Sequence, residues 1–185
     1  MNLIEHIEKY LGAITSGESV NNDEFGKLIF CKFQNQPNNN ITTYLTLGLS
    51  DHILNLKEKK WARMELLAGV YSSQENSKMN DLLLYISDRM LRTHNAILRG
   101  QAIGIPDNIF DNKGLKSVYV SIPVFFEDGF ATFEETTPAT IFAWIFPLYE
   151  NERDFINKNG WNKFEDELEV ADCDFWNLNR KPLDI

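Results

Sequence analysis

The stretch 140-TIFAWIFPLYENERDFINKNGWNKFEDEL-168 decides the fold of this chain. It opens with the run Ile141 to Phe146, which is unbroken in its apolar character and contains three aromatic residues. Such a run is typical of a strand that is covered on both faces, so we expect it in the middle of a sheet. Pro147 has no N–H to donate to a neighbouring strand, and we therefore expect the strand to end there.

Two helical segments are predicted to follow this strand. Acidic residues crowd the opening turns of the first segment and Lys158 lies near its close, as the helix dipole favours. Gly160 then supplies a stop signal. In the second segment Trp161, Phe164 and Leu168 share one helical face, and acidic residues occupy most of the remainder. The stretch therefore joins a buried strand to an acidic surface.

Length and composition favour one domain over residues 1–185. The chain is 43% hydrophobic and 12% aromatic, enough to bury a core without disulfides or metals. Cys31 and Cys173 are far apart, and we expect both to be reduced. The N-terminus lacks the basic start and apolar core of a secretory signal, and no apolar run approaches membrane-spanning length. We expect a soluble cytoplasmic protein without membrane contact.

The formal net charge is −9. Phosphate recognition needs clustered Lys and Arg, so this charge argues against direct binding of nucleic acid. The surplus is uneven, because residues 150–185 hold ten acids and five bases, which accounts for −5 of the total. Two interpretations stay open: a solvated surface that favours solubility, or a docking patch for a basic partner.

The rest of the chain predicts both helices and strands. Three successive strands rich in β-branched and aromatic residues suggest an antiparallel meander. Together the elements predict an α/β (α+β) fold, with a mixed, largely antiparallel central sheet and flanking helices. The predicted strands are 27–33, 41–49, 62–71 and 118–122; the predicted helices are 2–14 and 77–99; a small hairpin or lid is predicted at 125–133, an irregular loop at 101–114, and an extended tail anchored by Phe175 and Trp176.

Residue patterns that would indicate catalysis are missing. The chain has no glycine-rich phosphate loop, HExxH, CxxC pair or GxSxG elbow. His6 is predicted to be exposed on the polar side of the first helix, and His94 to be a hydrogen-bonded core residue. Asp51-His52 is a loop pair without an identifiable nucleophile, and its use by a small hydrolase stays open as an alternative. We therefore expect a protein that is not an enzyme.

Metal and cofactor sites are likewise not expected. Three histidines, two distant cysteines and no patterned aspartates do not make a ligand set. Cys31 lies in an apolar strand, where a thiol behaves as a small hydrophobic side chain. Glu134 and Glu135 are neighbours on an extended chain and face opposite ways, so we interpret them as solvated acids and not as a catalytic pair.

A set of short motifs, in order from residue 41 to residue 182, resembles the suppressor-of-fused (SUFU) domain family. The strongest parts are the T-x-GLS turn, the strand-borne R-x-EL and the PL-x-x-x-E element. The motifs are ITTYLTLGLSDH (41–52), ARMELL (62–67), HNAILRGQAI (94–103), IFAWIFPLYENE (141–152), NGWNKFEDEL (159–168) and NLNRKP (177–182).

This resemblance implies a mixed α/β sandwich and a binding function. In animals the domain is similar to the first half of a regulator that sequesters a transcription factor, and the second half is not present in this chain. The chain looks more like the short bacterial members, which resemble immunity proteins or antitoxins encoded beside secreted polymorphic toxins. Some of those toxins are nucleases of the LXG type.

The resulting hypothesis is an immunity protein that binds and neutralises a cognate secreted toxin. If the toxin is a nuclease, its active site must be basic, and acidic side chains would complement it. A regulator that accepts a peptide strand at a sheet edge is the alternative. The predicted partner-binding residues are Glu165, Asp166, Glu167, Glu169, Asp172 and Asp174, with Trp161 and Trp176 as aromatic anchors.

Overall fold

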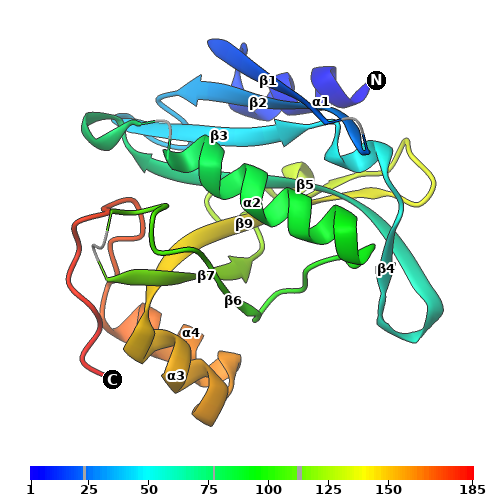
Figure 1. Cartoon of the computed structure of the whole chain (residues 1–185). Helices are drawn as coiled ribbons and strands as arrows, with labels where there is room; N and C mark the ends of the chain where they lie inside the picture. The colour runs from blue at the N-terminus through cyan, green and yellow to red at the C-terminus, as the bar shows by residue number, and fades with distance from the viewer. Residues whose placement is uncertain (23, 77, 112–113) are drawn as a thin grey trace.

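The computed structural model describes residues 1–22, 24–76, 78–111 and 114–185. Its strands form one twisted sheet, shown in Figure 1, in which most neighbours run antiparallel and β5 and β9 run parallel. β4 (Leu54–Leu56) pairs with β5, and β8 (Thr132–Phe133) pairs with β9. The order across the sheet is β1 (Ser16–Asn22), β2 (Gly26–Gln34), β3 (Ile41–Leu47), β5 (Lys60–Tyr71), β9 (Thr140–Tyr149), β7 (Leu115–Ser121) and β6 (Ala102–Gly104).

Strand β9 lies in the middle of the sheet, as its apolar run predicts. Its side chains alternate between two cores: Phe142 and Trp144 belong to one, and Ala143 and Ile145 to the other. The expectation that Pro147 ends the strand is wrong, because β9 continues to Tyr149. Pairing with β5 stops at Trp144, so Pro147 lies where the strand has β7 as a neighbour on one side, a place that tolerates a missing N–H.

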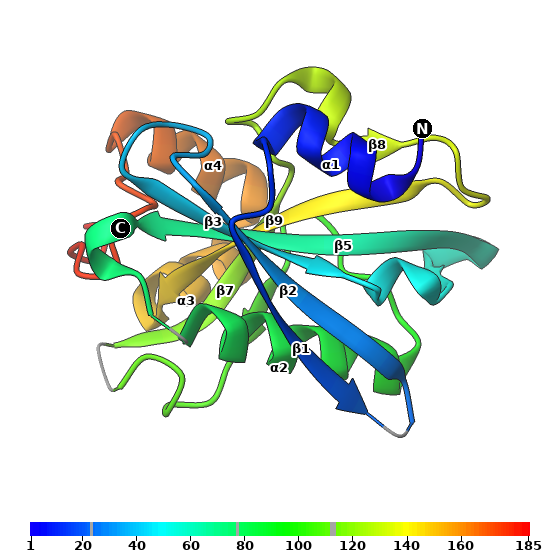
Figure 2. The same ribbon diagram turned by 90° about the horizontal axis from the view of Figure 1, so that it is seen from above.

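Helices cover both faces of the sheet, as Figure 2 shows from above. α2 (Lys78–Thr93) packs Met79, Leu83 and Ile86 against one face. α1 (Leu3–Leu11) and α4 (Trp161–Val170) pack against the other face and bury Ile7, Leu11, Phe164 and Leu168 there. α3 (Glu150–Asn159) follows β9 directly and ends at Gly160, as predicted. The predicted fold class is confirmed.

Several predicted boundaries need correction. The first helix ends at Leu11 and not at residue 14, because Gly12 caps it with φ 73°. The second long helix ends at Thr93 and not at Arg99, since His94 takes a left-handed conformation with φ 52°. The segment 125–133 is not a hairpin: a short 3-10 turn at Asp128–Phe130 leads into β8.

Three strands were missed: β1, β4 and β6. β6 lies in the predicted irregular loop 101–114 and forms by pairing with β7. Some predicted residues lie outside the described part of the chain. The polar sequence SGESVNN, which predicts a loop, forms the strand β1. It is held by backbone pairing to β2 and not by apolar burial. Ser77, the predicted start of the second helix, and Asn112 and Lys113, in the predicted 101–114 loop, lie outside the described residues.

The predictions for His6 and His94 are both wrong: the histidine predicted to be exposed is buried, and the one predicted to be buried is exposed. His6 is buried at 3% exposure, with its ring in contact with those of Tyr10 and Phe133 and its Nε2 3.2 Å from the Phe130 carbonyl oxygen. His94 is exposed at the end of α2. Because α2 ends at Thr93, His94 is not part of its apolar stripe. The 3-10 turn brings Phe130 against α1, where it covers His6. Neither effect can be read from the helical spacing of the sequence.

Both cysteines are free, as expected. Burial raises the pKa of Cys31 and of Cys173 to about 11, so neither thiol is activated. Among the described helices, none has the length and apolar character to cross a membrane.

Candidate functional site: a groove beside the C-terminal tail

An open groove of about 850 Å³ lies between the sheet face that carries β7 and β9, helix α4 and the tail that follows it. We call it the C-terminal groove. It combines an aromatic floor with an acidic edge. Its lining residues are Tyr71, Arg99, Tyr119, Ser121, Val124, Phe125, Trp144, Phe146, Glu165, Leu168, Glu169, Asp172, Cys173, Asp174, Phe175 and Trp176.

The floor is a continuous cluster of aromatic rings from three separate segments. Trp144 and Phe146 come from β9, Phe125 from the loop after β7, and Phe175 and Trp176 from the tail. Ring centroids lie 4.9 Å apart for Phe125 and Trp176, and 5.6 Å apart for Trp144 and Trp176. Phe125 remains 39% exposed, so part of this apolar surface faces solvent.

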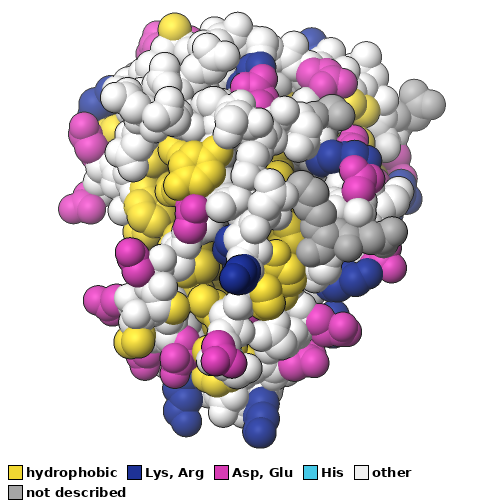
Figure 3. All heavy atoms as spheres, turned by 90° about the vertical axis from the view of Figure 1, so that its left-hand side faces the viewer, with side chains coloured by type: hydrophobic (Ala, Val, Ile, Leu, Met, Phe, Trp, Pro, Cys, Tyr) yellow, Lys and Arg dark blue, Asp and Glu magenta, His cyan; other side chains and the backbone are white. Residues whose placement is uncertain are grey.

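Gly69 of β5 makes room for Trp176. A Cβ atom on Gly69 would lie 2.5 Å from the indole ring, closer than real Cβ contacts come. The backbone completes the attachment, because the Tyr71 N–H donates to the Trp176 carbonyl oxygen at 2.9 Å. Figure 3 shows hydrophobic side chains gathered on the face that carries the tail, with acidic side chains around them. The tail thus adds aromatic surface to the sheet.

One predicted acidic residue, Glu165, is engaged within the protein. Its carboxylate accepts two hydrogen bonds from Arg99, at 3.1 and 2.6 Å, and one from the Tyr119 hydroxyl at 2.8 Å. Burial raises the pKa of Tyr119, and the hydrogen bond to Glu165 raises it further. Arg99 also lies over the Trp161 ring, with 5.1 Å between the guanidinium carbon and the ring centroid. Glu165 and Trp161 therefore attach α4 to the segment around Arg99.

The other carboxylates of the groove are not bound to cations. Within the described part of the chain, no Lys or Arg forms an ion pair with Glu169, Asp172 or Asp174. Asp174 is in contact with Tyr71: burial raises the pKa of Tyr71 first, and its hydrogen bond and charge interaction with Asp174 raise it further. The groove therefore presents negative charge that the protein leaves uncompensated.

The structure brings most of the predicted residues together. Glu165, Glu169, Asp172, Asp174 and Trp176 line the groove. The remaining three are on α4 outside its lining: Trp161, Asp166 and Glu167.

Sequence reasoning missed the contribution of the loop after β7. Val124 and Phe125 line the groove, and Val124 is 57% exposed. Ile122, which is not in the lining, is 43% exposed, so this loop presents apolar side chains to solvent. The available signal was the string IPVFF, whose apolar residues continue past the predicted strand end at Pro123.

The T-x-GLS and R-x-EL motifs meet in a buried hydrogen-bonded network. The Glu65 carboxylate accepts from the Thr46 hydroxyl at 2.6 Å, from the Gly48 and Ser50 N–H groups at 3.0 Å each, and from the Ser50 hydroxyl at 2.7 Å. Arg63 donates to the Ser50 carbonyl at 2.7 Å. Burial raises the pKa of Glu65 to about 7, against the lowering effect of these hydrogen bonds. These motif residues therefore fix a turn.

The PL-x-x-x-E and NLNRKP motifs are likewise joined by a buried interaction, the ion pair of Glu152 with Arg180. The Glu152 carboxylate is fully buried and binds Arg180 through two hydrogen bonds of 2.5 and 2.7 Å. Arg180 also donates to the Pro147 carbonyl at 3.0 Å and lies 5.0 Å from the Tyr149 ring centroid. Burial lowers the pKa of Arg180, but the Glu152 contacts outweigh this and raise it. This pair anchors the tail beyond the groove.

The alternative site at Asp51-His52 has a structural role. The Nε2 atom of His52 lies 3.0 Å from the Phe25 carbonyl oxygen, which holds the loop to the residue just before β2. The Asp51 carbonyl accepts from Arg63 at 3.0 Å, and its side chain is exposed. The described residues contain no group of three or more His, Cys, Asp or Glu side chains that suits a metal ion.

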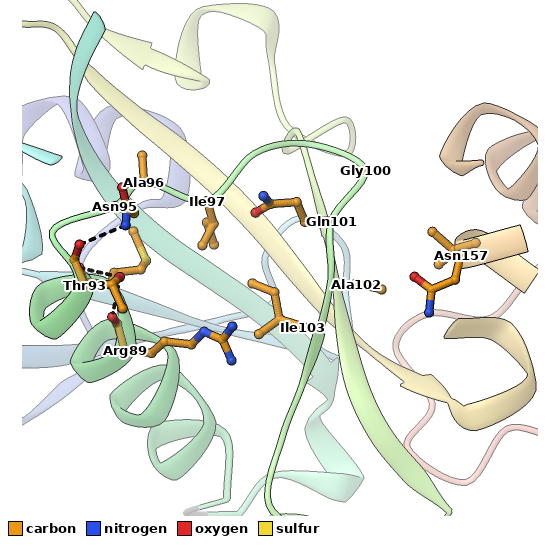
Figure 4. A pocket seen from close by; sticks show the side chains of 12 residues that line it. Arg89, Thr93, Asn95, Ala96, Ile97, Gly100, Gln101, Ala102, Ile103 and Asn157 are labelled. Atoms are coloured by element: carbon orange, nitrogen blue, oxygen red, sulfur yellow. Dashed lines mark hydrogen bonds between the residues drawn. The ribbon is translucent and has the colours of Figure 1, made fainter. Parts of the chain in front are cut away.

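A second cavity, of about 460 Å³, lies between the end of α2, the following loop, β6 and α3. Figure 4 shows Arg89, Gln101 and Asn157 around it, with Asn95 donating to the Thr93 carbonyl at 2.8 Å. The described residues that line it include neither a carboxylate nor an aromatic ring. It therefore differs in chemistry from the C-terminal groove.

Comparison with known proteins gives consistent matches. The model of the family described as suppressor of fused protein (SUFU) matches residues 24–181. Immunity protein YqcF of Bacillus subtilis (strain 168) is 23% identical over 151 residues, which cover 80% of this chain and 77% of that protein.

Solved structures share the fold at low sequence identity. A SUFU homolog from Neisseria gonorrhoeae FA 1090 superimposes with a TM-score of 0.77 at 14% identity, covering 97% of this chain and 93% of the other. A chain of the Sufu-Fu complex gives 0.71 at 13% identity, covering 97% and 89%. Drosophila Suppressor of Fused gives 0.68 at 15% identity and 97% coverage of this chain, which spans 49% of that protein's chain.

Proposed function

The chain belongs to the suppressor-of-fused family, and from this premise we propose that it is an immunity protein that binds and neutralises a cognate toxin. It acts as a single domain over residues 1–185, in the cytoplasm, by protein–protein contact and without catalysis. The observation that carries the proposal is the C-terminal groove, in which an aromatic floor adjoins carboxylates that have no cationic partner in the described chain.

Two comparisons support a protein partner. The relative from Bacillus subtilis bears the name of an immunity protein, and one solved structure of the same fold is a complex of Sufu with Fu. Aromatic residues in a desolvated centre surrounded by charged groups are the usual anatomy of a binding hot spot. The groove has both parts, so it is the surface that we propose contacts the toxin.

A basic toxin domain fits this surface best. The acidic edge and the net charge of −9 would steer a positively charged partner and raise its association rate. If the toxin is a nuclease, carboxylates of this chain would enter the toxin's active site and occupy the place of the substrate phosphates. The proposed contacts are Asp166, Glu167, Glu169, Asp172, Asp174 and Trp176, with Glu165 and Trp161 holding α4 in place.

The second candidate is a regulator that binds an extended peptide along a sheet edge. Strand β1 supports it, because β1 ends the sheet and most of its residues are exposed. Such a ligand would add main-chain hydrogen bonds to β1 and would not need the acidic residues.

Co-expression with a toxin encoded next to this gene tests the proposal. Protection of the host cell is the expected result, and loss of viability despite expression of both proteins would contradict it. A variant with Asp166, Glu169, Asp172 and Asp174 changed to Lys tests the surface, while leaving the Glu165 contacts intact. We expect it to fold and to lose protection; retained protection would remove the groove as the contact surface.

The salt dependence of toxin binding separates the two candidates. Binding at the acidic groove should weaken as salt is added, because solvent-exposed charges are screened. Binding at the edge of β1 rests on backbone hydrogen bonds and should change little. As a control, Glu134 and Glu135 are exposed acids outside the groove lining, and their change to Lys should leave protection intact.

A further inference from the structure

We propose that the C-terminal groove receives an arginine side chain, carried by a segment of the partner in which apolar residues flank the arginine. The guanidinium would lie over the ring of Trp176 and bind Asp172 and Asp174. The flanking apolar residues would cover Val124 and Phe125. This inference rests on the proposed function only in assigning the segment to the toxin.

The first argument is that the groove offers two kinds of surface at once. Phe125 and Trp176 are in ring contact at 4.9 Å, and both line the groove. The carboxylates of Glu169, Asp172 and Asp174 line it too. An arginine side chain has an apolar stem and a charged, planar head, so it can contact both surfaces. A purely apolar side chain would leave the carboxylates without compensation, and an acidic one would be repelled.

The second argument comes from the protein's own arginines. Three arginines of the described chain each lie over an aromatic ring and pair with a carboxylate, an arrangement in which cation–π attraction and charge pairing act together. Arg99 also lines the groove but is engaged with Trp161 and Glu165. Among the described residues, no arginine lies over Trp176 or pairs with Asp172 or Asp174. The three examples are Arg92 over Phe25 with Glu24, Arg99 over Trp161 with Glu165, and Arg180 over Tyr149 with Glu152, at 5.5, 5.1 and 5.0 Å from the ring centroid.

The third argument concerns Trp144 on the floor. Its indole nitrogen is buried and has no hydrogen-bond partner among the described residues. Trp144 is 3% exposed, lines the groove and contacts Trp176 and Phe125. An unpaired buried donor costs free energy, and small movements of these rings would let a backbone carbonyl of the inserted segment accept from it. A peptide segment supplies such a carbonyl, whereas a free cation does not.

The volume of the groove agrees with a segment and not with a lone side chain. At about 850 Å³ it lies within the range of sites that enclose a small-molecule ligand. An arginine with an apolar residue on each side is a probe of suitable size. The proposed occupant is therefore a protruding loop of the partner that carries this short sequence.

The test uses three blocked tripeptides: acetyl-Leu-Arg-Leu-amide, acetyl-Leu-Gln-Leu-amide and acetyl-Leu-Glu-Leu-amide. Binding to the full chain is followed by NMR of the tryptophan indole N–H signals. We expect saturable shifts of the Trp144 and Trp176 signals with the arginine peptide, and at least ~10-fold weaker binding of the glutamine peptide. Equal binding of these two peptides, or no shift with any of them, would overturn the proposal.

Matched variants locate the binding. The variant Glu169→Gln/Asp172→Asn/Asp174→Asn keeps the shape of each side chain and should weaken the arginine peptide by at least ~10-fold. The control Asp81→Asn/Glu134→Gln/Glu135→Gln makes the same change in net charge at exposed acids that do not line the groove, and should bind like the unchanged chain. An equal loss in both variants would overturn the proposal.

Two further results have fixed meanings. If sedimentation shows that the chain forms dimers, and the groove variant abolishes them, a second copy covers the groove and the proposal is wrong. If the arginine peptide binds as expected but the neighbouring toxin is not neutralised, the proposed function fails and the groove chemistry stands.

Discussion

Glu152 and Arg180 lie 28 residues apart in sequence and form a buried ion pair, with hydrogen bonds of 2.5 and 2.7 Å. Glu152 belongs to the first turn of α3, immediately after the central strand, and Arg180 to the tail. The same carboxylate accepts from the Leu183 N–H at 3.0 Å. The pair therefore fixes the tail that supplies Phe175 and Trp176 to the groove.

Removal of Arg180 should destabilise the protein strongly. Arg180→Ala leaves the Glu152 carboxylate buried without its partner, and breaking one side of a buried pair costs about 3–5 kcal/mol. Urea unfolding followed by circular dichroism measures the loss. Lys181→Ala is the control, because the Lys181 side chain is exposed, and it should change stability by less than ~0.5 kcal/mol. Similar losses for both variants would contradict a structural role of the pair.

Stability should depend on pH through Glu65. Its pKa is about 7 in the folded protein, above the ordinary value of 4.5. Between these values the folded state retains a proton that the unfolded state has lost, so the stabilising contribution of Glu65 is fully present below pH 4.5 and is lost as the pH rises through 7. The contribution is on the order of 3 kcal/mol.

The variant Glu65→Gln isolates this contribution, since an amide does not titrate. Thermal unfolding of both proteins is measured across the range from pH 4 to pH 8, taken as roughly the window that brackets the two pKa values. The difference in stability between the unchanged chain and the variant should shift in favour of the variant as the pH rises. A constant difference across this range would show that the pKa of Glu65 is the same in the folded and unfolded states.

Gly48 should not tolerate a side chain. Its φ is 107°, which L side chains rarely adopt, and a Cβ would lie 2.6 Å from the Lys27 carbonyl oxygen. Gly48→Ala should therefore cost more than ~2 kcal/mol in chemical unfolding. Gly26→Ala is the matched control: its φ is 81°, but nothing lies within 4 Å, so it carries the backbone strain without the clash. Equal costs would show that the contact with Lys27 is relieved by a small shift.

Gly69→Ala should displace Trp176 from the groove. The added Cβ would lie 2.5 Å from the indole ring, and overpacking of this kind costs about 1–3 kcal/mol. We expect a change in tryptophan fluorescence and in near-UV circular dichroism, together with weaker binding of the partner. Gly104→Ala, in open space at β6, should leave all three measurements unchanged. An unaltered spectrum for Gly69→Ala would mean that the backbone of β5 moves instead.

The fold was largely predictable because its central strand, β9, is encoded by one continuous apolar run. β9 and the helices α3 and α4 follow from the sequence of residues 140–168, and the confirmed meander follows from alternation and composition. β1 was not predictable, since SGESVNN has no apolar pattern and forms a strand through pairing with β2. The burial of His6 depends on Phe130, which is 124 residues away.

The candidate site was predictable by charge but not by shape. The acids at 165–174 are close in sequence, and the structure places Glu169, Asp172 and Asp174 along one groove. Its floor joins Phe125, Trp144 and Trp176, which no spacing relates, because the sheet and the tail bring them together. The identity of the floor therefore required the three-dimensional arrangement.

The position of β9 between β5 and β7 also has a consequence for biosynthesis. Of the described strands, β9 is the last to be translated, yet it occupies the centre of the sheet. Until it emerges, a nascent chain that has already formed the β2–β3–β5 meander exposes the open edge of β5, and such edges promote aggregation. A cell that makes this protein must therefore keep that edge from pairing with other chains during synthesis, and chaperone demand should fall once β9 has emerged and paired with β5.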